Sequence, residues 1–476
     1  MSSSPDALVV GAGPNGLAAA ITLAQAGRSV RVYEAQATVG GGARSAALTL
    51  PGFVHDLGSA IHPLGLGSPF FKTLGLERHG LEWLQPEVAV AHPFDDGTAA
   101  ALYPSLEKTC EALGKDGAAY RKLMGPLVRR WEALAGEFLQ PMIHLPRHPF
   151  LLAAFGLAAL QPSTFLARRL FHGEHARGLF AGLAAHSFLP LEAPATTAFA
   201  LVLGSAGHAV GWPLPRGGAQ KISDALASVL RELGGEIVTG QRVSSARELP
   251  ETRATLLDLT TWQAAKVADS MLPDAYRKKL ERFPHGPGIW KIDYALDGPV
   301  PWTADACRRA GTVHLGGTLD EVAEGERDTN RGRMPARPFV LVAQHGVCDP
   351  SRAPAGQQTL WAYCHIPRGY KGDCTAAIEA QIERFAPGFG ARVLARHVSG
   401  PKRLELENAN LAGGDISGGN TDLWHLVARP IASANPYRMP GDAGLYLCSS
   451  STPPGGGVHG MCGHLAARAA LRRELR

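Results

Sequence analysis

The stretch that decides the fold reads ALVVGAGPNGLAAAITLAQAGRSVRVYE and runs from Ala7 to Glu34. It begins with a short apolar run over residues 7–10, which is typical of a buried parallel strand. Gly11, Gly13 and Gly16 follow in the spacing G-x-G-x-x-G. The first glycine permits a tight turn out of the strand, the second lets a pyrophosphate approach the backbone, and the third lets a helix pack close to the strand.

A helix and a second strand complete this unit. The sequence predicts a helix over Pro14 to Ala26, ended by Gly27, and then a strand over Ser29 to Tyr33 that leads into Glu34. The helix N-terminus offers free N–H groups to a phosphate, and an acidic residue after the second strand can accept hydrogen bonds from a ribose. A glycine-rich turn without a ligand is the alternative. Because all three parts stand in the required places, we predict dinucleotide binding.

Composition narrows the class of protein. A chain of 476 residues favours two intertwined domains. Charged residues make up 19%, below the roughly 25% of typical proteins, and hydrophobic residues make up 45%, which leaves room for a large core and an apolar lining. The net charge of +5 includes no long Lys/Arg block, so we do not expect nucleic-acid binding. Weak attraction to an anionic membrane surface stays open.

The cysteine pattern favours a reducing compartment, and we expect a cytoplasmic protein. The number of cysteines is odd and none are spaced C-x-x-C, which argues against a disulfide framework and a redox-active disulfide. We expect neither a signal peptide nor a membrane span, and the sequence shows no metal-ligand pattern. The seven cysteines are Cys110, Cys307, Cys348, Cys364, Cys374, Cys448 and Cys462.

Further motifs lie at both ends of the chain. TVGGGARSAAL spans Thr38 to Leu48, and GFVHDLGSAIHP spans Gly52 to Pro63. Near the C-terminus, GLYLCSSSTPPGGGVHGMCGHLAARAAL predicts a strand over Leu445 to Cys448, a glycine loop at residues 455–457 and a helix over Gly460 to Leu471.

These motifs resemble the flavin amine oxidase and phytoene desaturase superfamily, in particular the phytoene desaturase-like branch that includes the pyridine nucleotide-disulfide oxidoreductase domain-containing protein 2 group. The resemblance implies an α/β fold: a glutathione-reductase-type, Rossmann-like FAD domain with an inserted α+β substrate domain of a mixed sheet plus helices. It assigns residues 1–75, 205–285 and 430–476 to the discontinuous FAD-binding domain, and residues 76–204 and 286–429 to the substrate domain.

The resemblance implies a noncovalently bound FAD. The C-terminal helix would direct its N-terminus at the flavin pyrimidine edge, where negative charge gathers on reduction. Val243 takes the place of a family valine that contacts the adenine side through its backbone. Ser449, Ser450 and Ser451 replace residues that are often glycine and acidic or small in the family, which leaves the phosphate and ribityl contacts open. The predicted cofactor-binding residues are Gly11, Gly13, Pro14, Asn15, Gly16, Glu34, Ala35, Gly41, Gly42, Ala43, Arg44, Gly58, Ser59, Val243, Ser450, Gly457, Val458 and His459.

Three histidines are candidate catalytic residues: His459, His62 and His186. His459 follows the C-terminal glycine triplet directly, so we expect it near the flavin, either as an acid/base or in packing. A covalent flavin link through His459 or Cys462 is disfavoured, because neither lies in a cysteinyl-flavin motif. Lys291 is a further candidate for the flavin face, as a lysine is in amine oxidases, although its motif differs.

The middle of the chain predicts a substrate domain. Residues 64–204 read as mostly helical, Ala264 to Arg282 as one helix, and Gly288 to Trp302 as a strand. PFLLAAFGLAAL, from Pro149 to Leu160, is either a buried helix or one that rests on a membrane and frames an apolar entrance. Further predicted elements are a helix over Ala219–Leu233 and strands over Glu236–Thr239, Gln241–Val243 and Thr359–Cys364, with His365 just after the last. The resemblance implies a strand over Leu256–Thr261 that returns to the FAD domain and a shaped loop over Leu404–Gly419.

The resemblance implies an FAD-dependent oxidoreductase that acts on carbon–carbon bonds of an apolar, isoprenoid or polyene substrate, by desaturation, saturation or isomerisation. Two alternatives stay open. One is an amine or amino-acid oxidase of the same fold. The other is a noncatalytic carrier of prenyl or other apolar ligands, as Rab GDP-dissociation inhibitors and escort proteins are. Oxygen, a quinone or NAD(P) could be the electron partner, and the oligomeric state is open.

Overall fold

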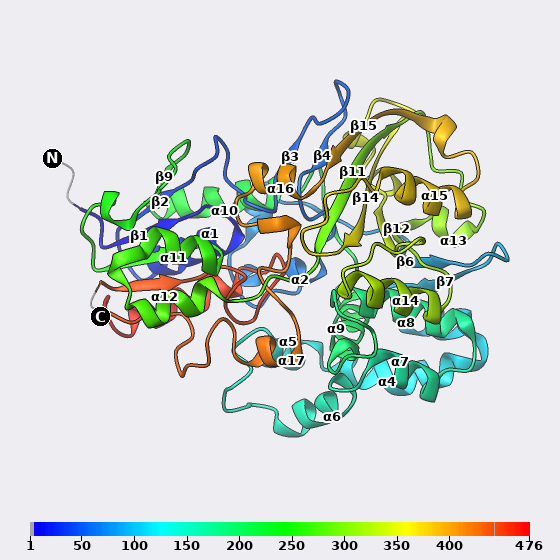
Figure 1. Cartoon of the computed structure of the whole chain (residues 1–476), viewed down its shortest axis with the longest axis horizontal. Coiled ribbons are helices and arrows are strands. Elements are labelled where there is room, and N and C mark those ends of the chain that lie inside the picture. Colours follow the sequence, from blue (N-terminus) through cyan, green and yellow to red (C-terminus); the bar gives the residue numbers. More distant parts are fainter. Residues whose placement is uncertain (1–3, 442) are drawn as a thin grey trace.

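The computed structural model describes residues 4–441 and 443–476, and two β-sheets organise them. The first sheet is parallel, in the order β16-β10-β1-β2-β9, and lies on the left in Figure 1. Its strands are β1 (Ala7–Val10), β2 (Val30–Tyr33), β9 (Glu236–Val238), β10 (Ala254–Leu257) and β16 (Leu445–Leu447).

Helices with small residues pack closely on this parallel sheet. α1 (Pro14–Gln25) contacts both α10 (Gln220–Glu232) and α18 (Met461–Leu471). A Cβ atom at Gly463 of α18 would overlap the carbonyl oxygen of Asn15 in α1, so only glycine permits this approach of the two helices. The C-terminal helix is thereby fixed against the first helix, more than 400 residues earlier in the chain.

The second sheet is mixed and has seven strands in the order β15-β11-β14-β13-β12-β6-β7. Successive side chains along each strand point to opposite sides, so the sheet has two faces of different character. One face is apolar and packs against α15 (Thr375–Phe385). The opposite face carries Lys291, Asp293, Trp361 and Tyr363 in paired register on β11 and β14. The strands are β6 (Val88–Pro93), β7 (Ala99–Leu102), β11 (Gly288–Leu296), β12 (Ala310–Leu315), β13 (Val340–Ala343), β14 (Gln358–Ile366) and β15 (Val393–Ser399).

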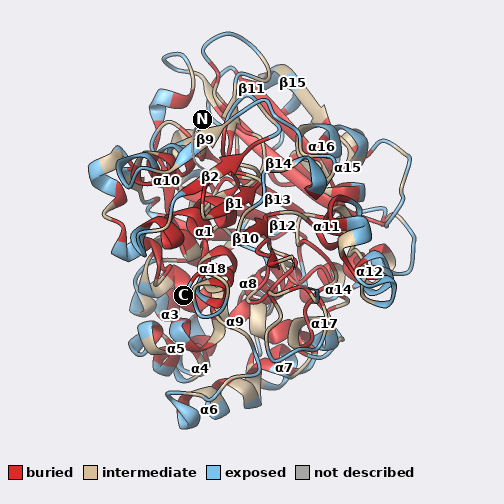
Figure 2. Ribbon diagram, turned by 90° about the vertical axis from the view of Figure 1, so that its left-hand side faces the viewer, coloured by how far each residue is buried: buried red, intermediate tan, exposed pale blue. Residues whose placement is uncertain are grey.

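A layer of helices lies below the seven-stranded sheet in Figure 1 and shares an apolar core with it. α8 contacts β6, β7 and β12, and α9 packs beside α8. Figure 2 shows the strands buried at the centre and α6 exposed at the rim. The helices of this layer are α3 (Leu106–Ala112), α4 (Gly117–Arg129), α5 (Trp131–Phe138), α6 (Pro149–Ala159), α7 (Ser163–Leu170), α8 (Glu174–Ala185), α9 (Thr196–Ala209) and α14 (Leu319–Asn330).

The remaining helices and strands are short. They are β3 (Ser45–Ala46), β4 (His55–Asp56), β5 (Trp83–Leu84), β8 (Leu214–Pro215), α2 (Pro63–Leu66), α11 (Thr261–Ala268), α12 (Asp274–Glu281), α13 (Asp305–Arg308), α16 (Pro401–Glu407) and α17 (Leu423–Val427). Among the described residues, no single helix is long and apolar enough to cross a membrane; the pair α6 and α7, bent by 93°, meets the length and composition test only when taken together.

The predicted fold class is confirmed. The strands of the parallel sheet come from residues 1–75, 205–285 and 430–476, and those of the seven-stranded sheet from residues 76–204 and 286–429. The domain boundaries themselves stay a prediction.

Residues 64–204 are mostly helical, as predicted, and also contain β6 and β7, whose alanines favour helix by propensity. Several other predicted elements were wrong. The single helix expected over Ala264–Arg282 is two, α11 and α12, because the chain turns at Asp269, where φ is 23°. Residues 241–243 form no strand, His365 lies within β14, and α16 occupies the start of the loop expected over Leu404–Gly419.

Candidate functional site

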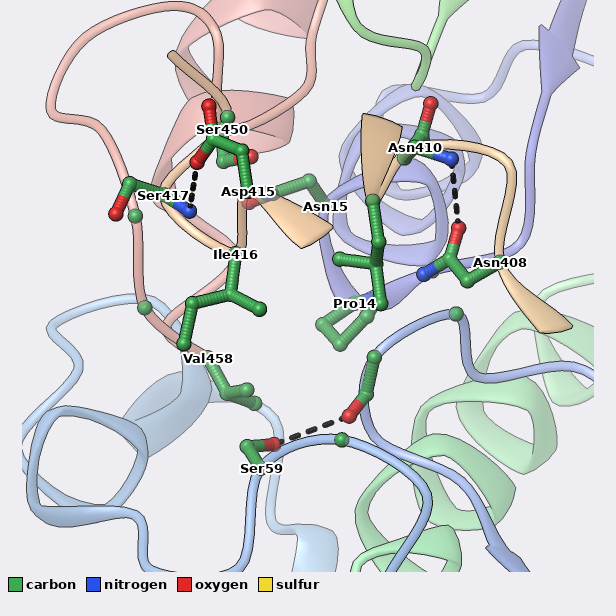
Figure 3. Close-up of a pocket in the computed structure, with 18 of the residues that line it drawn as sticks. Pro14, Asn15, Ser59, Asn408, Asn410, Asp415, Ile416, Ser417, Ser450 and Val458 are labelled. Atoms are coloured by element: carbon green, nitrogen blue, oxygen red, sulfur yellow. Dashed lines mark hydrogen bonds between the residues drawn. The ribbon is translucent and has the colours of Figure 1, made fainter. Parts of the chain in front are cut away.

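One large cavity of about 1360 Å³ connects the two halves of the molecule. It begins at the carboxyl ends of β1 and β2, where ligands bind in open α/β sheets, and continues to the Lys291 face of the seven-stranded sheet. A site for one small ligand usually measures ~300–1,000 Å³. The cavity therefore has room for two ligands, one at each end. Figure 3 shows how separate segments of the chain gather around it.

The first glycine loop encloses a carboxyl group that the motif did not predict. The backbone N–H of Gly16 donates to Oδ2 of Asp258, at 2.9 Å, and Asp258 follows β10 directly. A Cβ at Gly13 would lie 2.8 Å from the same oxygen, and one at Gly16 would overlap the carbonyl of Gly11. A glycine at position 16 therefore allows the helix to pack close to the strand. The space beside Gly13 is partly occupied by the carboxyl group of Asp258.

Glu34 ends β2 with both carboxylate oxygens directed at backbone donors. The N–H of Ala12 donates to Oε2 at 2.8 Å, and the N–H of Gln36 donates to Oε1 at 2.9 Å. These bonds hold the carboxylate at the cavity wall, where its remaining lone pairs can accept from a ribose.

A second glycine loop faces the first. A Cβ at Gly41 would lie 3.1 Å from the Cα of Gly13, whereas one at Gly42 would meet no atom within 4 Å and would enter the cavity. The Ser59 hydroxyl donates to the Gly42 carbonyl at 3.2 Å (Figure 3). Arg44 donates to the carbonyls of Gly41, at 3.0 Å, and of Glu407 in α16, so it joins this loop to α16.

His459 lies at the C-terminal glycine loop with its imidazole engaged. The N–H of Met461 donates to its Nδ1 at 3.1 Å, which caps the start of α18. Burial lowers the pKa of His459 to about 4, although hydrogen bonding to the Gly456 and Gly455 backbone acts in the other direction. The imidazole is therefore neutral near pH 7 and fixes the loop that lines the cavity.

His62 and His186 have different surroundings. The Nε2 of His62 lies 3.0 Å from the Ser59 hydroxyl, behind the cavity wall, and burial lowers its pKa to about 4. His186 lines the cavity, and its Nε2 lies 3.2 Å from Nε2 of His314. Burial lowers the pKa of His186 to about 3, so this imidazole is also neutral.

The structure brings most of the predicted site residues to one cavity. Gly16 and His62 do not line it, and the roles of all of them stay predictions. The predicted site residues that line the cavity are Gly11, Gly13, Pro14, Asn15, Glu34, Ala35, Gly41, Gly42, Ala43, Arg44, Gly58, Ser59, His186, Val243, Ser450, Gly457, Val458 and His459.

The far end of the cavity is mostly apolar and aromatic. The rings of Trp361 and Tyr363 lie 4.9 Å apart and nearly perpendicular, and Lys291 places its Nζ 5.8 Å from the Trp361 ring. Lys291 and Asp293 form a buried ion pair, as expected for residues two apart on one strand face. Burial raises the pKa of Asp293 to about 6 despite the nearby lysine. The other apolar walls include Phe155, Phe188, Trp212 and Leu341.

Sequence reasoning missed Arg429 as well as Asp258. Arg429 is buried and donates to the carbonyls of Ser450, Asn420 and Ser417 at 2.9, 2.9 and 2.6 Å. Asp415 accepts from the N–H of Ser417 at 2.7 Å (Figure 3). Arg429 and Asp415 thus fix the conformation of the loops at the middle of the cavity. Two features of the sequence could have indicated these residues: Arg429 stands directly before a proline, and Asp258 stands directly after a strand.

Comparison with known proteins identifies homologues of this chain. Residues 9–73 match the model of an NAD(P)-binding Rossmann-like domain. The chain is 27% identical to pyridine nucleotide-disulfide oxidoreductase domain-containing protein 2 of Rattus norvegicus, over 98% of this chain and 93% of the relative. It is also 27% identical to a phytoene dehydrogenase of Streptomyces griseus, over 95% and 92% of the two chains.

Solved structures share the fold at lower identity. An oxidoreductase from Methanosarcina mazei is 18% identical, with a TM-score of 0.63, over 98% of this chain and 100% of that one. A redesigned putrescine oxidase is 18% identical, with a TM-score of 0.62, over 98% of both chains. The resemblance expected from the motifs is thus confirmed: this chain is homologous to the phytoene dehydrogenases and to the pyridine nucleotide-disulfide oxidoreductase domain-containing protein 2 group, on an α/β fold that resembles the amine oxidases.

Proposed function

We propose that this protein is an FAD-dependent oxidoreductase that desaturates, saturates or isomerises carbon–carbon bonds of an apolar, isoprenoid or polyene substrate. The observation that carries the proposal is the single cavity, which joins two glycine loops at one end to an aromatic and aliphatic chamber at the other. The homologous phytoene dehydrogenases supply the substrate class.

The residues at the first end fit a noncovalent FAD. Gly42 leaves open space where a Cβ would stand, and the Oδ1 of Asn15 is buried without a hydrogen-bond partner among the described residues. Bound FAD would supply hydride transfer. Cys462 is unsuited to a covalent link, because its thiol donates to the carbonyls of Thr452 and Gly455 and burial raises its pKa to about 12.

The chain's own groups would bind and orient the substrate. Phe188 and Leu341 exclude water from the chamber, which favours an apolar ligand. His186 presents a neutral imidazole that can accept a hydrogen bond or a proton from a bound substrate. His62 and His459 hold the cofactor loops by the hydrogen bonds described above.

Anaerobic reduction of the FAD-loaded protein tests the proposal. A panel of isoprenoids and polyenes, primary and secondary amines, and amino acids would be added in detergent micelles. Desaturation of a saturated isoprenoid should bleach the flavin absorption as a carbon–carbon double bond forms. Saturation should instead require chemically reduced FAD, whose absorption returns as an unsaturated isoprenoid is added. Isomerisation should move a double bond with no net bleaching. Bleaching by amines alone would contradict the proposed substrate class. A His186→Asn variant should slow the reduction without weakening FAD binding.

One observation favours the alternative of an amine or amino-acid oxidase. Lys291 and the Trp361–Tyr363 pair lie together at the far end of the cavity. Hydrogen peroxide released only in the presence of an amine would support that alternative. A protein that binds prenyl chains but refuses FAD would instead support the carrier.

We also propose a cytoplasmic protein that contacts the membrane surface peripherally. Leu145, Phe150 and Leu157 are 93%, 88% and 76% exposed, on α6 and the segment before it. Arg168 and Arg169 follow in α7, and Phe155 of α6 lines the cavity. Flotation with anionic vesicles tests this: the wild type should float, and a Phe150→Asp/Leu157→Asp variant should not. Equal flotation of both would contradict it.

A further inference from the structure

Asp258 lies inside the anion-binding turn of the cofactor site, and its place there is fixed. Its own N–H donates to the carbonyl of Val10 at 2.8 Å, and its carbonyl accepts from Nδ2 of Asn410 at 2.9 Å. The residue is 7% exposed and lines the cavity. These bonds hold the backbone of Asp258 from both sides, and the N–H of Gly16 holds its carboxyl group in the turn.

The carboxyl group supplies the cap that α1 lacks. Gly13 is the N-cap residue of α1 and has no side chain, and Oδ2 of Asp258 accepts from the N–H of Gly16 in its place. The other oxygen, Oδ1, has no hydrogen bond to any described residue. A carboxylate here therefore occupies the positive end of the helix that would otherwise attract a phosphate.

We propose that Asp258 takes up one proton from solvent when the glycine loop binds the dinucleotide, so that only the protonated carboxyl group permits tight binding. The inference rests on the proposed function, since it concerns the FAD site. A protonated carboxyl group keeps one acceptor for the N–H of Gly16 and gains one O–H donor for a phosphate oxygen. An ionised carboxylate can only repel the pyrophosphate.

The surroundings place this protonation near neutral pH. Burial raises the pKa of Asp258 to about 7, Glu34 acts in the same direction, and the N–H groups of Gly16 and Gly13 oppose it.

Cys448, Cys462 and His459, on neighbouring elements, do not change their protonation between pH 6 and 8. They therefore do not add to the expected pH dependence of FAD binding. Burial raises the pKa of Cys448, at the end of β16, well above its usual value, and that of Cys462, in α18, to about 12. Burial lowers the pKa of His459 to about 4. The cationic residues Arg44, Arg242, Lys266 and Arg429 line the same cavity, together with the carboxyl group of Glu34.

Calorimetric titration of the FAD-free protein with FAD, at pH 6 and pH 8, tests the proposal. With a pKa of about 7, Asp258 is roughly one-tenth ionised at pH 6 and roughly nine-tenths ionised at pH 8. The dissociation constant should therefore be about tenfold larger at pH 8. Titrations in two buffers of different ionisation enthalpy should show uptake of about 0.9 proton at pH 8 and about 0.1 at pH 6.

The Asp258→Asn variant is the matched test, because its amide keeps one acceptor for Gly16 and one donor for a phosphate. It should bind FAD equally at both pH values, with the affinity that the wild type has at pH 6, and without proton uptake. Asp320→Asn, on the exposed surface of α14, should behave as the wild type. Equal affinity of the wild type at both pH values, or the same pH dependence in Asp258→Asn, would overturn the inference and leave the FAD site intact. No FAD binding by either protein at pH 6 would overturn the proposed function as well.

Discussion

Replacing Lys291 by Met should destabilise the protein in a pH-dependent way. Lys291 and Asp293 are 2% and 0% exposed at their side chains, and Oδ1 of Asp293 has no hydrogen-bond partner among the described residues. Breaking a buried ion pair on one side costs ~3–5 kcal/mol, because the remaining charge is buried alone. The loss should appear in the free energy of unfolding at pH 7.

Protonation of Asp293 limits this cost, and the limit becomes smaller as the pH is lowered. The pKa of Asp293 is raised by burial from 3.8 to about 6, and removal of the lysine raises it further. A carboxyl group raised in this way contributes stability that is full below 3.8 and is lost as the pH rises through its folded-state pKa. At about 1.4 kcal/mol per pH unit, keeping it neutral costs about 4.5 kcal/mol at pH 7 and about 1.7 kcal/mol at pH 5.

Urea unfolding of three proteins measures the effect: the wild type, Lys291→Met, and Lys291→Met/Asp293→Leu. The single variant should lose more stability at pH 7 than at pH 5. The double variant should recover most of the loss, because removing both members of a buried pair is often neutral. A penalty that is the same at both pH values, or a double variant as unstable as the single one, would refute the reasoning.

Three further substitutions separate packing from cofactor binding. Gly463→Ala should lower the thermal unfolding midpoint, at a cost of ~1–3 kcal/mol, because its Cβ would overlap the carbonyl of Asn15; an unchanged midpoint would contradict the close packing of α1 and α18. Gly42→Ala should leave the midpoint unchanged but weaken FAD binding about tenfold in a fluorescence titration, because its Cβ enters the cavity. Glu34→Gln should weaken FAD binding by ~1.5–3 kcal/mol, as expected for loss of a hydrogen bond to a charged group, and unaltered affinity would argue against a ribose contact.

The parts of the site that sequence could predict are those encoded locally. The turn from Gly11 to Gly16 and the acid at Glu34 belong to one continuous segment, so their spacing predicts their geometry. The predicted bounds of α18 were also correct to within one residue, because the helix directly follows its glycine loop in the sequence.

Contacts between distant segments could not be predicted in this way. Asp258 is 242 residues from Gly16, whose N–H donates to its carboxyl group, and no local sequence pattern predicts that contact. His459 lies beside the glycine loop as expected, yet only the structure shows that the start of α18 engages its Nδ1. Strands β6 and β7 were not predicted, because burial in a sheet outweighs the helical preference of alanine.

The visible absorption spectrum of the purified protein, before and after denaturation, tests the central proposal most directly. A flavin spectrum whose chromophore separates from the unfolded chain is predicted, because the proposed FAD is bound without a covalent link. A colourless protein that also fails to bind added FAD would contradict the proposed function and would leave the carrier as the better account of the apolar chamber.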